Sequence, residues 1–254
     1  CAMQKTLDGR DLFLQITRLV ILCERKCAGV ACNMCTEFAV AVQPVDQPRQ
    51  GGHVFGLVQQ TLFAVTADST GERTLGRYRW GLLPPWAKDQ SLATRLFNAR
   101  AETVTEKPSF RTAFAHRPCV IPVDGFYEWD HREGRQRQPH YFTRRDGTPL
   151  LLAGLHETWR DPHDQDAAPL HTCTVLTTTP SGDMDGIHDR MPVIVTTRSA
   201  ETWLDTSLPE MVRHELLVPA PPGTLDHWGV SNAVGNVRHN GPDLIARNEP
   251  TTLF

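Results

Sequence analysis

Short runs of strand-forming residues, each bounded by turn-forming residues, recur along most of this chain and constrain its fold more than any other feature. A few segments with helical spacing separate the runs. Many short strands with few helices predict an α+β fold, built on a curled, barrel-like mixed β-sheet with a few flanking helices. The predicted strands cover residues 61–67, 74–82, 119–123, 125–129, 140–144, 150–155, 172–178 and 191–195.

Three helices are predicted around these strands. Apolar residues spaced by three and four predict one at 11–25. A second is expected at 105–115, and a third from Ser199, as N-cap, through Trp203. The Asp146-Gly147 pair predicts a hairpin turn between 140–144 and 150–155, because Asp-Gly readily adopts positive φ.

Size and charge restrict the class of protein. At 254 residues, without a composition break that marks a boundary, the chain is expected to form a single domain, 1–254. A net charge of -3 excludes a strongly basic DNA-coating protein but leaves a local basic groove possible. No long apolar run predicts a membrane span or a signal peptide. Seven cysteines, an odd number, favour reduced thiols and a cytoplasmic setting.

Two titratable residues lie in sequence contexts that favour chemistry. Glu128 sits between aromatic residues, and strand alternation places it on the same face as Phe126. An apolar setting disfavours the charged carboxylate, which suits a proton carrier, although a solvent-facing strand glutamate is the alternative. His188 precedes an apolar strand and is a candidate acid or base, with an ordinary loop histidine as the alternative.

Asn98 and Arg100 are two residues apart, so on an extended segment both point the same way and can meet one phosphate or sugar. The alternative is a turn asparagine and an arginine paired with Glu102.

Cys1 offers a thiol and a free α-amine on one residue if the mature chain starts there. Such a 1,2-aminothiol condenses with an aldehyde to a Schiff base, on which the thiolate closes a thiazolidine ring. The alternative is that residue 1 is only where the numbering begins.

Five segments together resemble the SOS-response-associated peptidase family, over about residues 75–245. Each is a modest motif, but all five occur in the family's order. They are Arg-Trp-Gly-Leu-Leu-Pro-Pro-Trp at 79–86, Asn-Ala-Arg-Ala-Glu at 98–102, the segment from Cys119 to Trp129, Ile-His-Asp-Arg-Met-Pro at 187–192 and Ala-Val-Gly-Asn-Val at 233–237.

The resemblance implies a protein that binds single-stranded DNA and covalently traps abasic sites through its N-terminal cysteine, shielding the lesion and removing its own initiator methionine. By this resemblance, Cys1, Glu128 and His188 are catalytic, and Asn98 and Arg100 hold DNA. Trp80 and Trp86 belong to a DNA-facing segment. A monomer without cofactor or metal is expected, in the cytoplasm, and associated with the nucleoid if the source is bacterial.

Residues 1–52 diverge from the family, while 53–254 form the family-like core. Members begin Cys-Gly-Arg, whereas here Ala2 and Met3 follow Cys1.

Three alternatives therefore stay open. The first is an N-terminal-nucleophile cysteine peptidase. The second is an inactive relative that only binds single-stranded DNA. The third is a structural zinc site made by Cys23, Cys27, Cys32 and Cys35.

Overall fold

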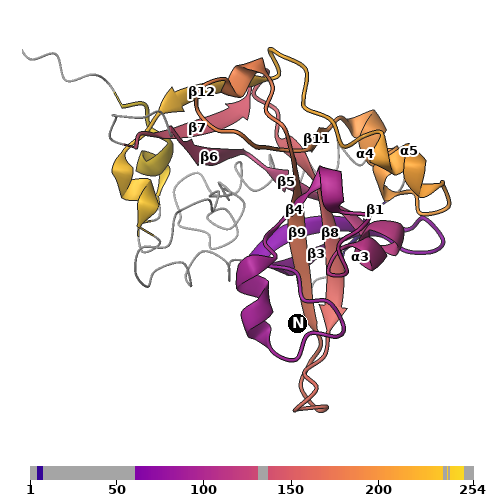
Figure 1. Ribbon diagram of the computed structural model, residues 1–254. Helices are drawn as coiled ribbons and strands as arrows, with labels where there is room; N and C mark the ends of the chain where they lie inside the picture. Colours follow the sequence, from indigo (N-terminus) through magenta and orange to yellow (C-terminus); the bar gives the residue numbers. More distant parts are fainter. Residues whose placement is uncertain (1–4, 8–60, 131–136, 237–238, 240, 249–254) are drawn as a thin grey trace, which may run out of the picture.

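A computed structural model of the chain describes residues 5–7, 61–130, 137–236, 239 and 241–248. Two β-sheets form its framework, with short helices placed around them (Figure 1). The predicted α+β class and the barrel-like mixed sheet are confirmed. No helix within the described ranges is long and apolar enough to cross a membrane.

The larger sheet closes on itself. Its strands follow the order β1-β3-β2-β5-β8-β9-β10, and β3 also pairs with β9 in parallel, which joins β3, β2, β5, β8 and β9 into a ring. The other pairs in this ring are antiparallel. The strands of the larger sheet are β1 Lys5–Leu7, β2 Thr61–Ala67, β3 Arg73–Trp80, β4 Asn98–Arg100, β5 Pro118–Val123, β8 Leu150–Trp159, β9 Leu170–Thr178, β10 Met191–Pro192 and β11 Ile194–Val195.

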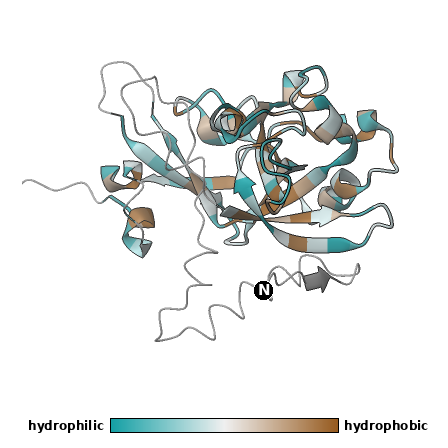
Figure 2. Ribbon diagram, turned by 90° about the horizontal axis from the view of Figure 1, so that it is seen from below, coloured by the Kyte–Doolittle hydropathy of each residue, from teal (hydrophilic) through white to brown (hydrophobic). Residues whose placement is uncertain are grey.

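Alternation along the ring strands creates two apolar clusters. The inward cluster includes Ala64, Ile121 and Leu152, while the outward cluster contains their neighbours Val65 and Val120. Figure 2 shows apolar segments along the strands at the centre of the molecule. Because apolar residues face both ways, the barrel is filled inside and must be covered outside.

Helices provide that cover on one side. α3 Arg111–His116, α4 Thr197–Leu204 and α5 Glu210–His214 lie beside the barrel. Phe114 and Trp203 pack in the outward cluster, and the Trp203 indole donates to the carbonyl of Cys119 at 2.8 Å.

The smaller sheet has the order β12-β7-β6 and lies at the other side of the barrel (Figure 1). Its strands are β6 Gly125–Trp129, β7 Pro139–Arg144 and β12 Leu225–Gly229. One face joins the inward cluster through Phe126 and Phe142, and the other packs Tyr127 and Tyr141 against Val234.

Five 3-10 turns complete the described structure. They are η2 Gln90–Arg95, η3 Ala101–Thr103, η4 Gly182–Met184, η5 Asn232–Gly235 and η6 Pro242–Ile245.

Tertiary contacts changed several sequence predictions. The predicted strand 191–195 is two strands, because β10 pairs with β9 and β11 with β8. The helix expected at 105–115 is only α3, while α4 begins after Thr196, whose hydroxyl accepts from the Ser199 amide. Ser199 is therefore the third helical residue and completes a capping box. The helix predicted at 11–25 lies outside the described residues.

The Asp146-Gly147 turn forms, with φ +73° at Gly147, but it does not make a hairpin. β7 belongs to the smaller sheet and β8 to the larger one, so the turn joins two sheets.

Candidate active site

Glu128 and His188, predicted separately from the sequence, lie side by side in the structure. The His188 Nε2 atom is 3.5 Å from Glu128 Oε2, and the two side chains are 4% and 6% exposed. β6 supplies Glu128, and the segment between η4 and β10 supplies His188. A buried carboxylate next to a buried imidazole can exchange a proton, and the burial of Glu128 excludes the alternative of a solvent-facing glutamate.

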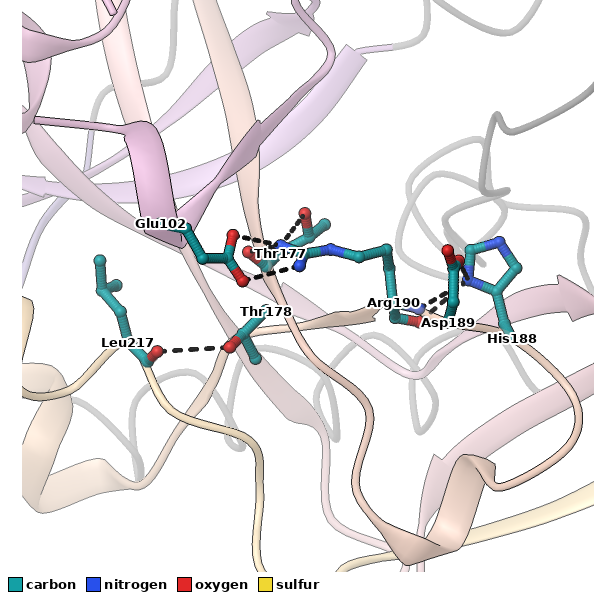
Figure 3. Close-up of polar contacts among 7 residues, drawn as sticks. All are labelled: Glu102, Thr177, Thr178, His188, Asp189, Arg190 and Leu217. Carbon is teal, nitrogen blue, oxygen red and sulfur yellow. Dashed lines mark hydrogen bonds and ion pairs between the residues drawn. The ribbon is translucent and has the colours of Figure 1, made fainter. Parts of the chain in front are cut away.

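The backbone of Arg190 fixes the other side of the His188 ring (Figure 3). The Arg190 amide donates to His188 Nδ1 at 3.0 Å, and the Arg190 carbonyl oxygen is 3.1 Å from the same atom. The carboxylate of Asp189, which is exposed, lies 3.5 Å from it. When Nδ1 accepts, the proton of the neutral ring is on Nε2, facing Glu128; when the ring is charged, Nδ1 donates to the carbonyl. Both protonation states therefore have hydrogen-bond partners.

An ion pair connects the His188 segment to the Asn98–Glu102 segment. The Arg190 guanidinium donates to both oxygens of Glu102, at 2.7 and 2.9 Å, and to the carbonyl of Thr177 at 2.6 Å (Figure 3). The hydrogen bond from Arg190 lowers the pKa of Glu102. The partner of Glu102 is therefore Arg190, not Arg100 as the sequence alternative had it.

Asn98 and Arg100 lie on β4, which runs parallel to β9. Ala99 between them is fully buried, whereas Asn98 is half-buried and Arg100 exposed. Alternation on this strand gives the two polar side chains the shared face that the sequence predicted.

The two tryptophans of the 79–86 segment differ sharply. Trp80 is fully buried, and its indole donates to the carbonyl of Phe97 at 2.7 Å. The prediction that Trp80 faces DNA is therefore wrong, because its ring packs in the inward cluster. Trp86 is 57% exposed and available to a ligand.

Two histidines near Glu128 were missed by the sequence analysis. His140 on β7 lies directly opposite Glu128 on β6, and its Nδ1 atom is 3.2 Å from Nδ1 of His227 on β12. Only the pairing register reveals this, since 87 residues separate the two histidines.

Two of the seven cysteines lie in the part of the chain that the structure describes. Cys1, Cys23, Cys27, Cys32 and Cys35 lie outside the described residues. Cys119 and Cys173 are free but buried, and burial raises the pKa of both thiols, so neither is a reactive thiolate. Within the described part of the chain, no three His, Cys, Asp or Glu side chains are arranged to hold a metal ion.

Known proteins resemble this chain in sequence. The family model "SOS response associated peptidase (SRAP)" matches residues 26–237. The abasic site processing protein YoqW of Bacillus subtilis is 39% identical over 188 residues, which are 73% of this chain and 82% of that protein. The abasic site processing protein HMCES of Xenopus tropicalis is 33% identical over 72% of this chain and 60% of its own length.

A crystal structure of a protein from Bacteroides thetaiotaomicron has the same fold, with a TM-score of 0.67 and 30% identity over 76% of this chain and 84% of that one. Both the matched segments and the fold thus agree with the resemblance read from the motifs. The chain belongs to the SOS response associated peptidase family.

Proposed function

We propose that this protein processes abasic sites in single-stranded DNA and traps them covalently. The observation that carries the proposal is the buried contact between His188 Nε2 and Glu128 Oε2, which the Arg190–Glu102 ion pair links to the strand bearing Asn98 and Arg100. The similar proteins YoqW and HMCES, both named for abasic site processing, support the same substrate.

The trapping step uses Cys1. An abasic sugar in its open form carries an aldehyde, which the α-amine of Cys1 attacks with loss of one water to give a Schiff base. The thiolate then adds to the imine carbon, and the imine nitrogen takes a proton, which closes a thiazolidine ring. The reference pKa values of the amine, roughly 7.7–8.0, and of the thiol, about 8.5, leave reactive fractions of both at neutral pH.

Glu128 and His188 have separate parts in this proposal. His188 gives a proton to the ring oxygen of the closed sugar while the anomeric hydroxyl loses its proton to water, so that the ring C–O bond breaks and the hemiacetal opens to the aldehyde. Glu128 accepts a proton from the Cys1 amine, so that the lone pair is free to attack. A carboxylate and an imidazole at 3.5 Å allow both transfers without another residue.

Asn98, Arg100 and Trp86 form the proposed DNA contacts. Arg100 is exposed at the end of β4 and can neutralise a phosphate, while Asn98 can donate to a phosphate or sugar. The exposed Trp86 ring can stack on an unpaired base, whatever its sequence. Affinity for single-stranded DNA should therefore fall as salt rises.

The test is a crosslinking assay with protein prepared so that Cys1 is the first residue. It is mixed with a single-stranded oligonucleotide carrying one abasic site, and the product is separated under denaturing conditions. A shifted band is expected with this oligonucleotide and not with its undamaged counterpart.

Two controls address Cys1. Cys1→Ala removes the thiol, and one glycine added before Cys1 blocks the α-amine. Both should abolish the stable band, and a stable band with either protein would refute the assignment of Cys1. Binding without any crosslink in the unaltered protein would favour an inactive relative that only binds DNA.

We also propose that the protein removes its own initiator methionine, in line with the family's description as a peptidase. In a precursor with Met before Cys1, the thiol would attack the preceding carbonyl, which breaks the peptide bond, frees the Cys1 amine and leaves the methionine as a thioester on Cys1. Water would then hydrolyse this thioester and release the methionine. Mass spectrometry of the purified precursor, beside its Cys1→Ala form, measures this removal. Cleavage of unrelated peptides at a rate similar to crosslinking would instead favour a general cysteine peptidase. Size-exclusion chromatography tests the monomer that we propose.

A further inference from the structure

His188 lies on a loop between β9 and β10 that closes on itself. At its start, η4 is a single 3-10 turn, in which the Met184 amide donates to the Ser181 carbonyl at 2.9 Å. At its end, the sulfur of Met191 accepts from the Ser181 amide at 3.2 Å. Because the loop begins and ends at the same place, its contacts with the rest of the molecule decide where it holds His188.

One set of contacts attaches this loop to the larger sheet. β10 pairs with β9, and the Arg190 side chain donates to the Thr177 carbonyl on β9 and to the Glu102 carboxylate. Glu128, however, belongs to β6 in the smaller sheet. The 3.5 Å contact between His188 and Glu128 therefore also depends on how the loop is attached to the smaller sheet.

Asp183, in η4, provides a polar attachment to the smaller sheet. Its Oδ2 atom accepts from the amide of Leu225, the first residue of β12, at 2.8 Å. Its Oδ1 atom accepts from the amide of Gly223 at 2.7 Å. Hydrogen bonds from amides to a carboxylate are roughly twice as strong as those between neutral groups. One carboxylate thus holds two neighbouring amides of the turn that leads into β12.

The turn before β12 has a shape that suits this carboxylate. Gly223 has φ +88°, in the left-handed region that favours glycine. The amides of residues 223 and 225 point to the same side, where the Asp183 carboxylate lies. Thr224 stabilises the turn from within, because its amide and its hydroxyl both donate to the Pro221 carbonyl, at 3.1 and 2.6 Å.

The same turn is fixed to the end of β7. The Arg145 amide donates to the Thr224 carbonyl at 3.0 Å, and the Arg145 guanidinium donates to the Leu225 carbonyl at 3.1 Å. The loop and β12 also meet through buried side chains, since Met184 and Ile187 pack with Leu225 in the inward cluster. Apolar packing is not directional, whereas hydrogen bonds to two particular amides fix the register of the loop.

We propose that Asp183 is a positioning residue that holds the His188 loop in register with the smaller sheet and so keeps His188 Nε2 opposite Glu128 Oε2. It acts through His188 and does not need to touch the DNA. A catalytic group displaced by about 1 Å can lose on the order of 10²-fold in rate. The reaction readout of this inference rests on the proposed function, but its hydrogen-exchange readout does not.

The decisive variant is Asp183→Asn, because asparagine has the same shape but one of its two terminal atoms is a donor, so it cannot accept from both amides. Gly223→Ala disturbs the same contact from the other side. An added Cβ there meets no atom within 4 Å, but the φ of +88° is unfavourable for alanine. The matched control is Asp185→Asn, which changes an exposed carboxylate in the same loop.

The first readout is amide hydrogen exchange, followed by NMR. The Leu225 amide reports on the Asp183 contact, and the Arg190 amide, which donates to His188 Nδ1 at 3.0 Å, reports on the His188 ring. Both amides should exchange several-fold faster in Asp183→Asn and in Gly223→Ala than in the wild type. The control should leave both exchange rates unchanged.

The second readout is the single-turnover rate of crosslinking. At saturating abasic DNA this rate should fall by about 10- to 100-fold in both variants. The DNA concentration that gives half of the maximal rate should stay the same, since Asp183 acts on His188 and not on DNA binding. Asp183→Asn added to His188→Gln should cause no further loss, because the residue through which it acts is already gone.

Three results would overturn the inference. The first is wild-type exchange at the Arg190 amide in Asp183→Asn. The second is a further loss of the same factor when Asp183→Asn is added to His188→Gln, which a purely structural role would produce. The third is an equal loss of rate in the Asp185→Asn control. If the wild type does not crosslink at all, the proposed function fails, and the exchange of the Arg190 amide alone decides whether Asp183 positions His188.

Discussion

His188 and His156 are both largely enclosed by protein, but they lie toward opposite ends of the paired strands β8 and β9. At one end, Met191 pairs with Thr178, and His188 nearby contacts the carboxylates of Glu128 and Asp189. At the other, His156 pairs with Cys173 and lies against the edge of the Tyr78 ring. The two ends thus offer an imidazole opposite surroundings.

The consequences appear in the protonation of His156. Burial, with a smaller effect from Arg117 and His171, lowers the pKa of His156 to about 4. Among the described residues, no group forms a hydrogen bond with its Nδ1 atom. His156 is therefore a neutral packing residue at physiological pH, whereas His188 has partners for either protonation state. The two histidines therefore differ in the groups around them rather than in burial alone.

The largest effect is expected on the rate of crosslinking, and it should distinguish His188 from His156. Glu128→Gln and His188→Gln should each slow crosslinking to abasic DNA by about 10²–10⁴-fold, the usual contribution of general acid–base catalysis. His156→Phe, the matched control, should leave the rate within about twofold. Single-turnover kinetics at pH 7.5 measure all three. Equal losses in the three variants would mean that the two barrel ends do not differ as argued.

The second prediction concerns stability and acts on His156. The pKa of His156 is lower in the folded protein than in the unfolded chain. As pH falls, the unfolded chain therefore binds a proton at this residue before the folded protein does. Stability is therefore full above about pH 6.5 and is lost as pH falls toward 4. His156→Phe should remove this loss and gain on the order of 2–3 kcal/mol relative to wild type between pH 7 and pH 4. Urea unfolding at both pH values tests it; a constant difference would contradict it.

The third prediction compares arginines at the two ends. Arg100→Ala should weaken binding of undamaged single-stranded DNA by about 1 kcal/mol and reduce the salt dependence by roughly one phosphate contact. Arg160→Ala removes an exposed arginine just after β8 and serves as the control, with no change expected. Fluorescence anisotropy at several salt concentrations distinguishes the two. Similar losses would show that DNA covers both ends.

The smallest effect is expected from the Arg190–Glu102 ion pair. Glu102→Gln should cost no more than about 1 kcal/mol at pH 7, since the carboxylate is about half exposed. The pKa of Glu102 is lowered, so the ion pair stabilises the protein at neutral pH and is lost as pH falls through that lowered value. The difference from wild type in urea unfolding should therefore shrink in acid. A difference that grows in acid would contradict this ion pair.

The sequence predicted strands best where local pattern and pairing agree. The predicted ranges 61–67 and 125–129 match β2 and β6, because alternation and flanking turns mark both ends. The prediction of one strand at 191–195 was wrong, because residues 191–192 pair with β9 whereas residues 194–195 pair with β8. The helix at 105–115 was overestimated because turns around Pro108 take up its first half.

For the candidate site too, the sequence predicted some residues correctly and missed or misplaced others. Glu128, His188, Asn98 and Arg100 were identified from segments whose polar residues folding does not require, and the first two meet in the structure. Trp80 was misplaced because its motif does not say which tryptophan is buried. His140 and His227 escaped notice, since neither lies in a motif.

Local sequence determined the kinds of elements and the chemical groups available, because alternation, turn residues and side-chain chemistry act over a few positions. Tertiary structure alone decided which groups meet. The closure of β3 on β9, the transfer of the chain from β7 in one sheet to β8 in the other, and the β7–β12 pairing that brings His140 to His227 depend on pairings between distant segments. Such pairings follow from packing of the whole molecule, which no short stretch of sequence encodes.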